Sequence, residues 1–149
     1  MVIDGGCDPK LTLDDLGNAV RKCRIDFGAA IEFDAGLTEL AARKRRWAVA
    51  SIDYASGGKG HLIYLKPMIF DPELRDEPPD VRSYHDQHAD FPHESTADQF
   101  FPESQFESYR RLGLHTVAAF PSLAPPDCTD MFSRLAEDGK LARLPARTA

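Results

Sequence analysis

The sequence is poor in cysteine and has no long apolar run, and both absences narrow the classes of protein to consider. Its 149 residues include three cysteines, Cys7, Cys23 and Cys128, and no C-x-x-C pair. A zinc ribbon or a dithiol redox centre needs such a pair, so we expect free, buried thiols in a reducing compartment. No apolar stretch approaches the ~18 residues that span a bilayer, and no signal peptide is visible, which predicts a cytoplasmic protein.

The sequence also lacks an excess of positive charge. Lysine and arginine number 18 against 24 aspartate and glutamate residues, for a net charge of -6. We expect no nucleic-acid partner, because phosphate binding needs a basic face. The basic run at residues 43–46, RKRR, predicts a solvated turn. Contact with an anionic membrane surface or a lipid head group is the alternative interpretation of this run.

No G-x-S-x-G pentapeptide occurs in the chain. That motif holds the serine of an α/β-type hydrolase at a tight turn between a strand and a helix, so a nucleophile of this kind is not expected here. The stretch SGGKG at residues 56–60 resembles an anion-binding loop. It joins two predicted strands rather than a strand and a helix, and therefore predicts a hairpin turn.

The opening stretch, MVIDGGCDP, brings three apolar residues directly to Asp4, Gly5 and Gly6. This pattern indicates a buried strand that delivers a carboxylate to a glycine turn. Asp4 is therefore a candidate catalytic residue, although the chain offers it no serine motif to activate.

The first half of the chain alternates predicted helix and strand. Residues 12–27 predict a helix with Thr12 as N-cap and Gly28 just past its end. Its apolar residues recur at steps of three and four and predict one buried stripe, made of Leu13, Leu16, Val20, Cys23 and Phe27. Residues 29–36 read as a strand followed by a brief helical turn. Residues 46–55 and 61–70 predict a β-hairpin, with Pro67 ending the second strand or placing it at an edge.

The second half is predicted to be helical. Residues 71–80 form an acidic, proline-rich linker, and Pro79 suits the first turn of a helix through residue 88. Pro102 can open a second helix, and Thr96 with Gln99 has the spacing of a capping box. The expected buried face of that second helix comprises Phe106, Tyr109, Gly113, Val117 and Phe120. Beyond it we expect a short capped helix at residues 129–139 and a frayed tail.

Three histidines, His85, His88 and His93, lie near one another in YHDQHADFPH. Histidine and carboxylate clusters can bind zinc or iron, which makes a metal-dependent enzyme one hypothesis. The spacing fits poorly because Pro92 interrupts any helix before His93. We therefore favour a helix end with solvated or capping side chains, and expect no metal or other cofactor.

Several stretches together resemble one known family. VIDGGCDP, LGNAVRKCRIDFG, GHLIYLKP and DVRSYHDQHADFPHESTADQFFPESQFESYRRLG are similar to the C-terminal region of long bacterial patatin-like phospholipases, which are related to lysophospholipases. The similarity covers about residues 2 to 114. The resemblance implies an α/β fold and a Ser-Asp dyad, with serine in G-x-S-x-G and aspartate in D-G-G or D-G-A. In such a dyad the aspartate is the base, the serine attacks the ester carbonyl, and backbone N–H groups hold the oxyanion.

The chain departs from that family pattern because it lacks the serine motif. Asp4-Gly5-Gly6 matches D-G-G literally, yet in the long members VIDGGCDP resembles a second acidic element that follows the dyad aspartate. Asp4 is therefore a weak catalytic candidate, and a structural role at a strand end is expected.

These observations lead to one favoured hypothesis and one alternative. We expect an α/β fold (α+β if taken as a fragment), with residues 1–120 forming the C-terminal part of a patatin-like domain and residues 121–149 a short helix and tail. The favoured function is the C-terminal part of a patatin-like lipid acyl hydrolase, inactive alone, with possible peripheral membrane contact and a lipid or acyl-ester substrate in the full-length context. The alternative is a non-catalytic interaction module that completes or regulates a partner chain holding the serine half.

Overall fold

The computed structural model describes residues 1–70, 76–95, 97 and 99–119. Within these ranges four strands and four helices alternate along the chain. In order they are β1 (Val2–Ile3), α1 (Asp14–Phe27), β2 (Ala30–Ala35), α2 (Leu37–Ala41), β3 (Trp47–Asp53), β4 (Lys59–Leu65), α3 (Pro79–Gln87) and α4 (Glu103–Ala118). The predicted strand at 29–36, the hairpin, the helix opened by Pro79 and the helix beginning beside Pro102 are all confirmed.

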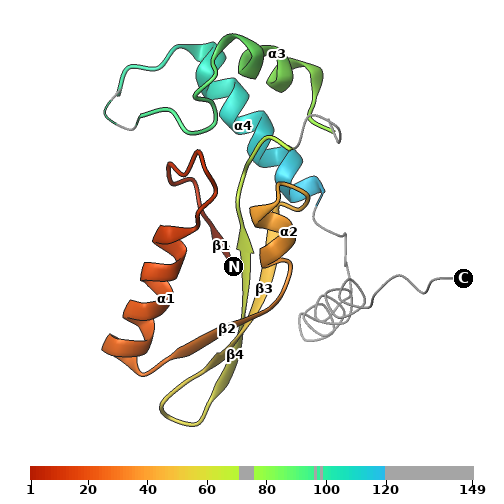
Figure 1. The fold of residues 1–149 in the computed structure, drawn as a ribbon. Helices are drawn as coiled ribbons and strands as arrows, with labels where there is room; N and C mark the ends of the chain where they lie inside the picture. The colour runs from red at the N-terminus through yellow and green to blue at the C-terminus, as the bar shows by residue number, and fades with distance from the viewer. Residues whose placement is uncertain (71–75, 96, 98, 120–149) are drawn as a thin grey trace, which may run out of the picture.

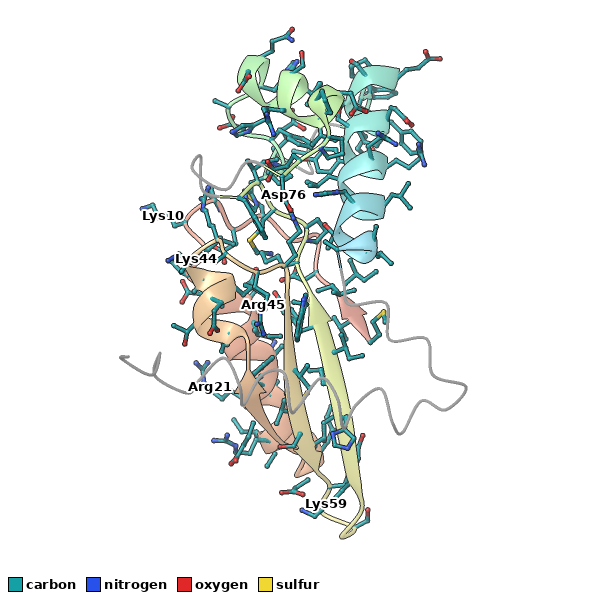
Figure 2. The ribbon with its side chains drawn as sticks, turned by 90° about the vertical axis from the view of Figure 1, so that its right-hand side faces the viewer. Lys10, Arg21, Lys44, Arg45, Lys59 and Asp76 are labelled. Carbon is teal, nitrogen blue, oxygen red and sulfur yellow. The ribbon has the colours of Figure 1, made fainter. Side chains whose placement is uncertain are left out.

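The four strands form one mixed sheet in the order β1-β4-β3-β2. β1 runs parallel to β4, whereas β2, β3 and β4 pair antiparallel. Figure 1 shows α1 standing to one side of the sheet, and α3 and α4 lying together beyond one end of it. The mixed sheet with helices confirms the α/β or α+β class. In Figure 2, Lys59 marks the tip of the hairpin and Asp76 the opposite end of the sheet, where the helices begin.

Among the described residues, one hydrophobic cluster lies in each of these two parts. The first lies on the sheet and consists of Leu11, Leu40, Ala48, Tyr64 and Met68, with Phe33 and Leu16 packed against it. The second joins α3, α4 and the loop between them, which we call the helical unit, through Val81, Tyr84, Phe91 and Leu112. Burial of apolar side chains of this size is the main stabilising contribution in each part.

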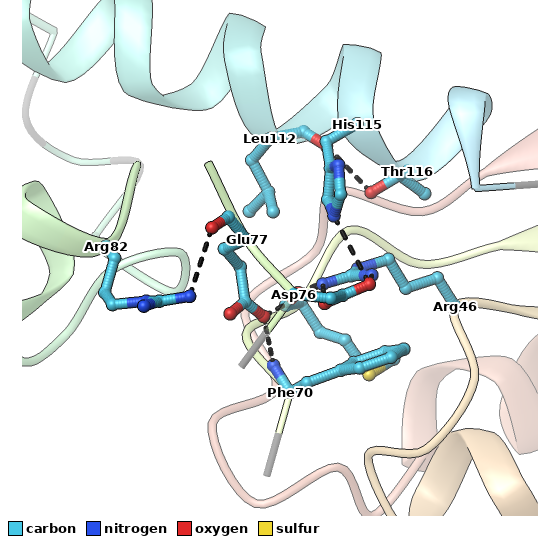
Figure 3. A network of polar contacts seen from close by, with 9 residues as sticks. Arg46, Phe70, Asp76, Glu77, Arg82, Leu112, His115 and Thr116 are labelled. Carbon is cyan, nitrogen blue, oxygen red and sulfur yellow. Dashed lines mark hydrogen bonds and ion pairs between the residues drawn. The ribbon is translucent and has the colours of Figure 1, made fainter. Parts of the chain in front are cut away.

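A buried arginine joins the sheet to the helical unit (Figure 3). Arg46 is 2% exposed and donates to Asp76 at 2.9 Å and to Glu77 at 2.9 Å. The same Glu77 carboxylate accepts the backbone N–H of Phe70, and the His115 ring lies 3.4 Å from Asp76. The prediction of a solvated turn is therefore wrong at Arg46. Its partners lie 30 and 31 residues away in the acidic segment that we predicted to be a linker.

The start of α1 differs from the prediction. Thr12 is not its N-cap: the helix begins at Asp14, and Leu13 precedes it in the left-handed region at φ 57°. The carboxylate of Asp8 instead accepts the N–H groups of Thr12 and Leu13, at 3.0 and 2.8 Å. Asp8 therefore satisfies N–H groups at the start of α1, as an N-cap residue does, although it lies several residues before the helix.

The predicted apolar stripe of α1 does face the rest of the fold, but it is only half-buried. Leu13 and Leu16 pack against the first core, no residue of α1 is fully buried, and Phe27, the last residue of the predicted stripe, is 75% exposed. A hollow of about 560 Å³ separates α1 from β2 and α2, and is lined mainly by apolar side chains such as Leu16 and Phe33. Gly28 does end the helix as predicted, at φ 60°, where a Cβ would lie 2.9 Å from that of Ala55.

The buried face of α4 is shifted from the predicted one. Ser108, Leu112 and Thr116 are buried, whereas Phe106 and Val117 are exposed. The polar residues reach the interior because Ser108 and Thr116 each donate to the carbonyl four residues earlier, as hydroxyls in helices commonly do. Periodicity of apolar residues alone therefore selected the wrong stripe.

Several predictions lie outside the described residues. These are the capping residue Thr96, the position of Phe120, the helix at 129–139, the tail and Cys128. The prediction of buried thiols is wrong for the other two cysteines, since Cys7 is exposed and Cys23 is half-buried, both free. Among the helices that the structure describes, none has the length and apolar character to cross a bilayer.

Candidate functional site

Asp4 lies where β1 ends, and its carboxylate is held by three donors. Oδ1 accepts the backbone N–H of Gly6 at 2.8 Å. Oδ2 accepts the Tyr64 hydroxyl and the Lys66 ammonium, the latter at 3.0 Å. The backbone N–H of Asp4 donates to Leu65 at 2.8 Å, which fixes the residue against β4. The strand therefore delivers the carboxylate to a glycine turn as predicted, although the exposed side chains of Val2 and Ile3 show that β1 is not buried.

The cation beside Asp4 is almost completely buried. The Lys66 side chain is 2% exposed, against 25% for the Asp4 side chain. Its ammonium donates to Asp4 and, at 3.1 Å, to the carbonyl oxygen of Gly6. A buried charge is tolerated only when it is paired and hydrogen-bonded, so Lys66 and Asp4 depend on one another.

These neighbours determine the protonation state of the Asp4 carboxyl group. Burial alone would raise the pKa of the Asp4 carboxyl, but hydrogen bonds from Tyr64, Gly6 and Lys66, together with the Lys66 charge, hold that pKa below its ordinary value. Burial and the adjacent carboxylate raise the pKa of Tyr64. Asp4 is thus an anion at neutral pH that is committed to three donors. A general base needs an oxygen directed at the nucleophile, and this arrangement instead favours a structural role at the strand end.

His93 ties the same N-terminal turn to the helical unit. Its Nδ1 accepts the backbone N–H of Asp8 at 3.1 Å, and its carbonyl oxygen accepts the Cys7 thiol at 3.1 Å. Because Nδ1 accepts a hydrogen bond, the neutral ring carries its proton on Nε2. Burial, with the charges of Lys66 and Arg43, lowers the pKa of the His93 imidazole. The ring is therefore neutral at pH 7 and acts as an acceptor.

The three histidines considered for metal binding do not converge. The His85 ring is hydrogen-bonded to the carbonyl oxygen of Phe91 at 2.9 Å, and the His88 ring stacks on Tyr84 at 4.1 Å. Within the described residues, no three histidine, cysteine or carboxylate side chains lie close enough together to hold a metal ion. The hypothesis of a metal centre built on His85, His88 and His93 therefore has no geometric support.

A mainly apolar pocket of about 290 Å³ opens beside the glycine turn. Gly5 and Pro92 line it, together with residues of α4 and of the segment before α4. The aromatic side chains of Phe101, Phe106 and Tyr109 line the pocket together with Gln105, while Glu94 and Ser95 add polar groups. Phe106 and Tyr109 were predicted from the sequence to lie on a buried helix face, whereas in the structure both line this pocket.

Lys66 and Tyr64 were also missed, because the predicted hairpin accounts for both residues as ordinary strand positions. A lysine directly before Pro67 in a strongly apolar run was the available signal. Comparison of the chain with family models, with curated proteins and with solved structures found no match in any of the three.

Proposed function

We propose that this chain is the C-terminal part of a patatin-like lipid acyl hydrolase that acts only together with a polypeptide segment carrying the nucleophilic serine. The resemblance over residues 2 to 114 supplies the family, and the outer edge of β1 is the structural observation that best supports the proposal. β1 lies at the edge of the sheet, and Val2 and Ile3 are 47% and 57% exposed.

An exposed strand edge with apolar side chains is a surface on which another strand can pair. Successive N–H groups of a strand point to opposite sides. The Asp4 N–H donates to β4, so the N–H of Ile3 points to the outer edge. A parallel strand from the serine-bearing segment would extend the sheet there.

In this proposal the catalytic base is supplied with the serine, and Asp4 is a positioning residue. The Asp4–Lys66 pair holds the turn at residues 4–6 in place next to the added strand. The attacking serine, the base and the oxyanion donors then belong to the other segment, as a dyad needs all three within hydrogen-bond reach of one another.

The proposal is tested first on the chain alone. Purified protein is expected to leave p-nitrophenyl acyl esters unhydrolysed above the rate of buffer. Co-expression with a patatin-like polypeptide that contains G-x-S-x-G is expected to yield a complex that co-purifies and hydrolyses these esters. A serine-to-alanine variant of that polypeptide serves as the blank.

Two variants separate pairing from chemistry. Ile3→Pro removes the outward N–H while leaving the bonds to β4, and is expected to prevent formation of the complex. Ile3→Thr keeps the N–H and a β-branched side chain, and is the matched control. Asp4→Asn in the complex is expected to change kcat less than about tenfold, whereas loss of a general base costs about 10²-fold or more. A loss of that size would assign Asp4 to the dyad.

The alternative function, a non-catalytic interaction module that regulates a partner chain holding the serine, is supported by the same strand edge. It predicts that the complex forms, and that the partner polypeptide already hydrolyses the esters when this chain is absent. Comparing the specific activity of the partner with and without this chain distinguishes the two functions.

A further inference from the structure

The pocket beside the glycine turn is lined by aromatic side chains that solvent can reach. Three aromatic side chains line it, and two of them, Phe101 and Phe106, are 50% and 58% exposed. Their rings are thus within reach of a molecule from solvent. The pocket volume of about 290 Å³ is close to the lower end of the range for small-ligand sites.

The polar group fixed at this pocket is a carboxylate. Glu94 Oε1 accepts the Tyr84 hydroxyl at 3.2 Å, and Oε2 accepts the Gln105 amide at 2.9 Å. These two bonds hold the carboxylate without neutralising it. Burial first, and then the charge of Glu94, raise the pKa values of Tyr84 and Tyr109, which both lie beside this carboxylate.

A second hollow adjoins the pocket, shares Phe101 and Phe106, and is lined by Glu103 and Glu107. Arg110 already pairs with the Glu107 carboxylate at 2.7 Å, so the negative charge at the pocket is that of Glu94 and Glu103. No lysine, arginine or histidine is among the described residues that line either hollow. The first turn of α4 contributes the positive end of a helix dipole at this point, and Glu103 lies in that turn and offsets it.

Aromatic faces beside a fixed carboxylate are the combination that binds organic cations. The negative face of each ring attracts a cation, and the attraction is largest when the cation gives up little hydration on binding. A methylated ammonium meets that condition, whereas a primary ammonium is strongly hydrated. An anionic headgroup or a fatty-acid carboxylate would instead be repelled by Glu94.

We propose that this pocket binds the trimethylammonium group of a choline headgroup. Phe101, Phe106 and Tyr109 contact the methyl groups, and Glu94 supplies the opposite charge. The assignment of a cation site stands on the pocket alone. Naming a choline lipid as its source rests on the proposed function. Phe100, next to Phe101, is 94% exposed, and it is the residue whose substitution tests contact with the apolar part of such a lipid.

The first experiment titrates the full chain with choline chloride, followed by the amide and methyl resonances of the pocket residues. Saturable shifts confined to this pocket are the expected result. The neutral analogue 3,3-dimethylbutan-1-ol has the same shape without the charge, and ethanolamine has the charge without the methyl groups. Both are expected to bind more weakly, by about tenfold for the neutral analogue. Equal binding of choline and the neutral analogue would overturn the proposal.

Two variants measure separately how much the Glu94 carboxylate and the aromatic rings contribute to choline binding. Glu94→Gln is expected to weaken choline binding about tenfold while leaving the neutral analogue unaffected. Phe106→Leu is expected to weaken it about two- to fivefold, the loss of one cation–π contact. Phe27→Leu, an exposed phenylalanine on α1, is the matched control and is expected to change nothing. Choline affinity unchanged in both pocket variants would refute the site.

The source of the headgroup is tested separately with lysophosphatidylcholine below its critical micelle concentration. Tighter binding than that of choline, reduced by Phe100→Ser, supports a lipid, and equal binding limits the ligand to the free cation. Choline binding without ester hydrolysis in the reconstituted complex would leave this site standing and reject the proposed function. Ester hydrolysis by the complex without choline binding would reject this site and support the proposed function.

Discussion

Lys66 and Arg46 are both buried cations, and their surroundings differ in a way that separates two roles. Arg46 is bound to two carboxylates and the Met68 carbonyl, stacks on the Phe70 ring at 3.7 Å, and joins the sheet to the helical unit. Lys66 has one carboxylate and one carbonyl, and holds a single turn at the open edge of the sheet. These contacts indicate that Arg46 stabilises the junction between the sheet and the helices, whereas Lys66 stabilises only the turn at residues 4–6.

The largest expected effect is that of Arg46→Met. The change leaves the Glu77 carboxylate, whose side chain is 2% exposed, without its cation. Uncompensated buried charge costs about 3 to 5 kcal/mol of the free energy of unfolding. Urea denaturation followed by circular dichroism measures this cost, and a loss below about 1 kcal/mol would break the comparison.

Lys66→Met is expected to cost less, about 2 kcal/mol, because the Asp4 side chain is partly exposed and keeps Tyr64 and Gly6 as donors. The matched control is Lys59→Met at the hairpin tip. Lys59 forms its ion pair with Asp53 in the open, with side chains 80% and 62% exposed, and such pairs contribute little. The same denaturation experiment ranks the three variants, and equal costs for Lys66 and Lys59 would contradict a buried role for Lys66.

The His93 contact predicts a pH dependence of stability. The pKa of His93 is lowered from its ordinary value of 6.5 in the folded chain, so the unfolded chain binds more protons. Stability from this group is therefore fully present above about pH 6.5 and is lost as pH falls toward the folded pKa. His93→Asn is expected to flatten the decline in unfolding free energy as the pH falls below about 6.5. An unchanged slope would mean that His93 is not neutral in the folded protein.

The pH profile has a second, lower window. The pKa values of Asp4 and Asp76 are held below 3.8, so the stability from both carboxylates is present above that pH and is lost as pH falls through the folded values. Asp4→Asn removes only the part belonging to the turn. The unfolding free energy is therefore measured against pH on the acid side for the unsubstituted chain and for Asp4→Asn. The difference between the two curves is the contribution of the Asp4–Lys66 pair, separate from that of Arg46 and Asp76.

The smallest expected effect concerns the start of α1. Asp8→Ala is expected to cost about 1 kcal/mol because two backbone N–H groups lose their acceptor. Thr12→Ala is expected to cost less, about 0.5 kcal/mol, because Thr12 contacts only side chains there. The reverse order, measured by thermal denaturation, would restore Thr12 as the cap.

The α1 start and the Arg46 cluster show what the sequence could and could not predict. Elements whose signals are local were predicted well: the hairpin, the helix opened by Pro79 and the stop at Gly28. Contacts between residues far apart in the sequence were not predicted, because a periodic pattern does not indicate which carboxylate pairs with which cation. Asp4 was identified by the glycines next to it, whereas its partners Tyr64 and Lys66 lie 60 and 62 residues away.

The dependence of activity on a serine-bearing partner is measured by ester hydrolysis, first with the chain alone and then in complex with a G-x-S-x-G polypeptide. We expect no hydrolysis of p-nitrophenyl esters by the chain alone, hydrolysis by the complex, and loss of that complex in Ile3→Pro but not in Ile3→Thr. Turnover by the isolated chain that disappears in Asp4→Asn would contradict the account and make Asp4 a catalytic residue.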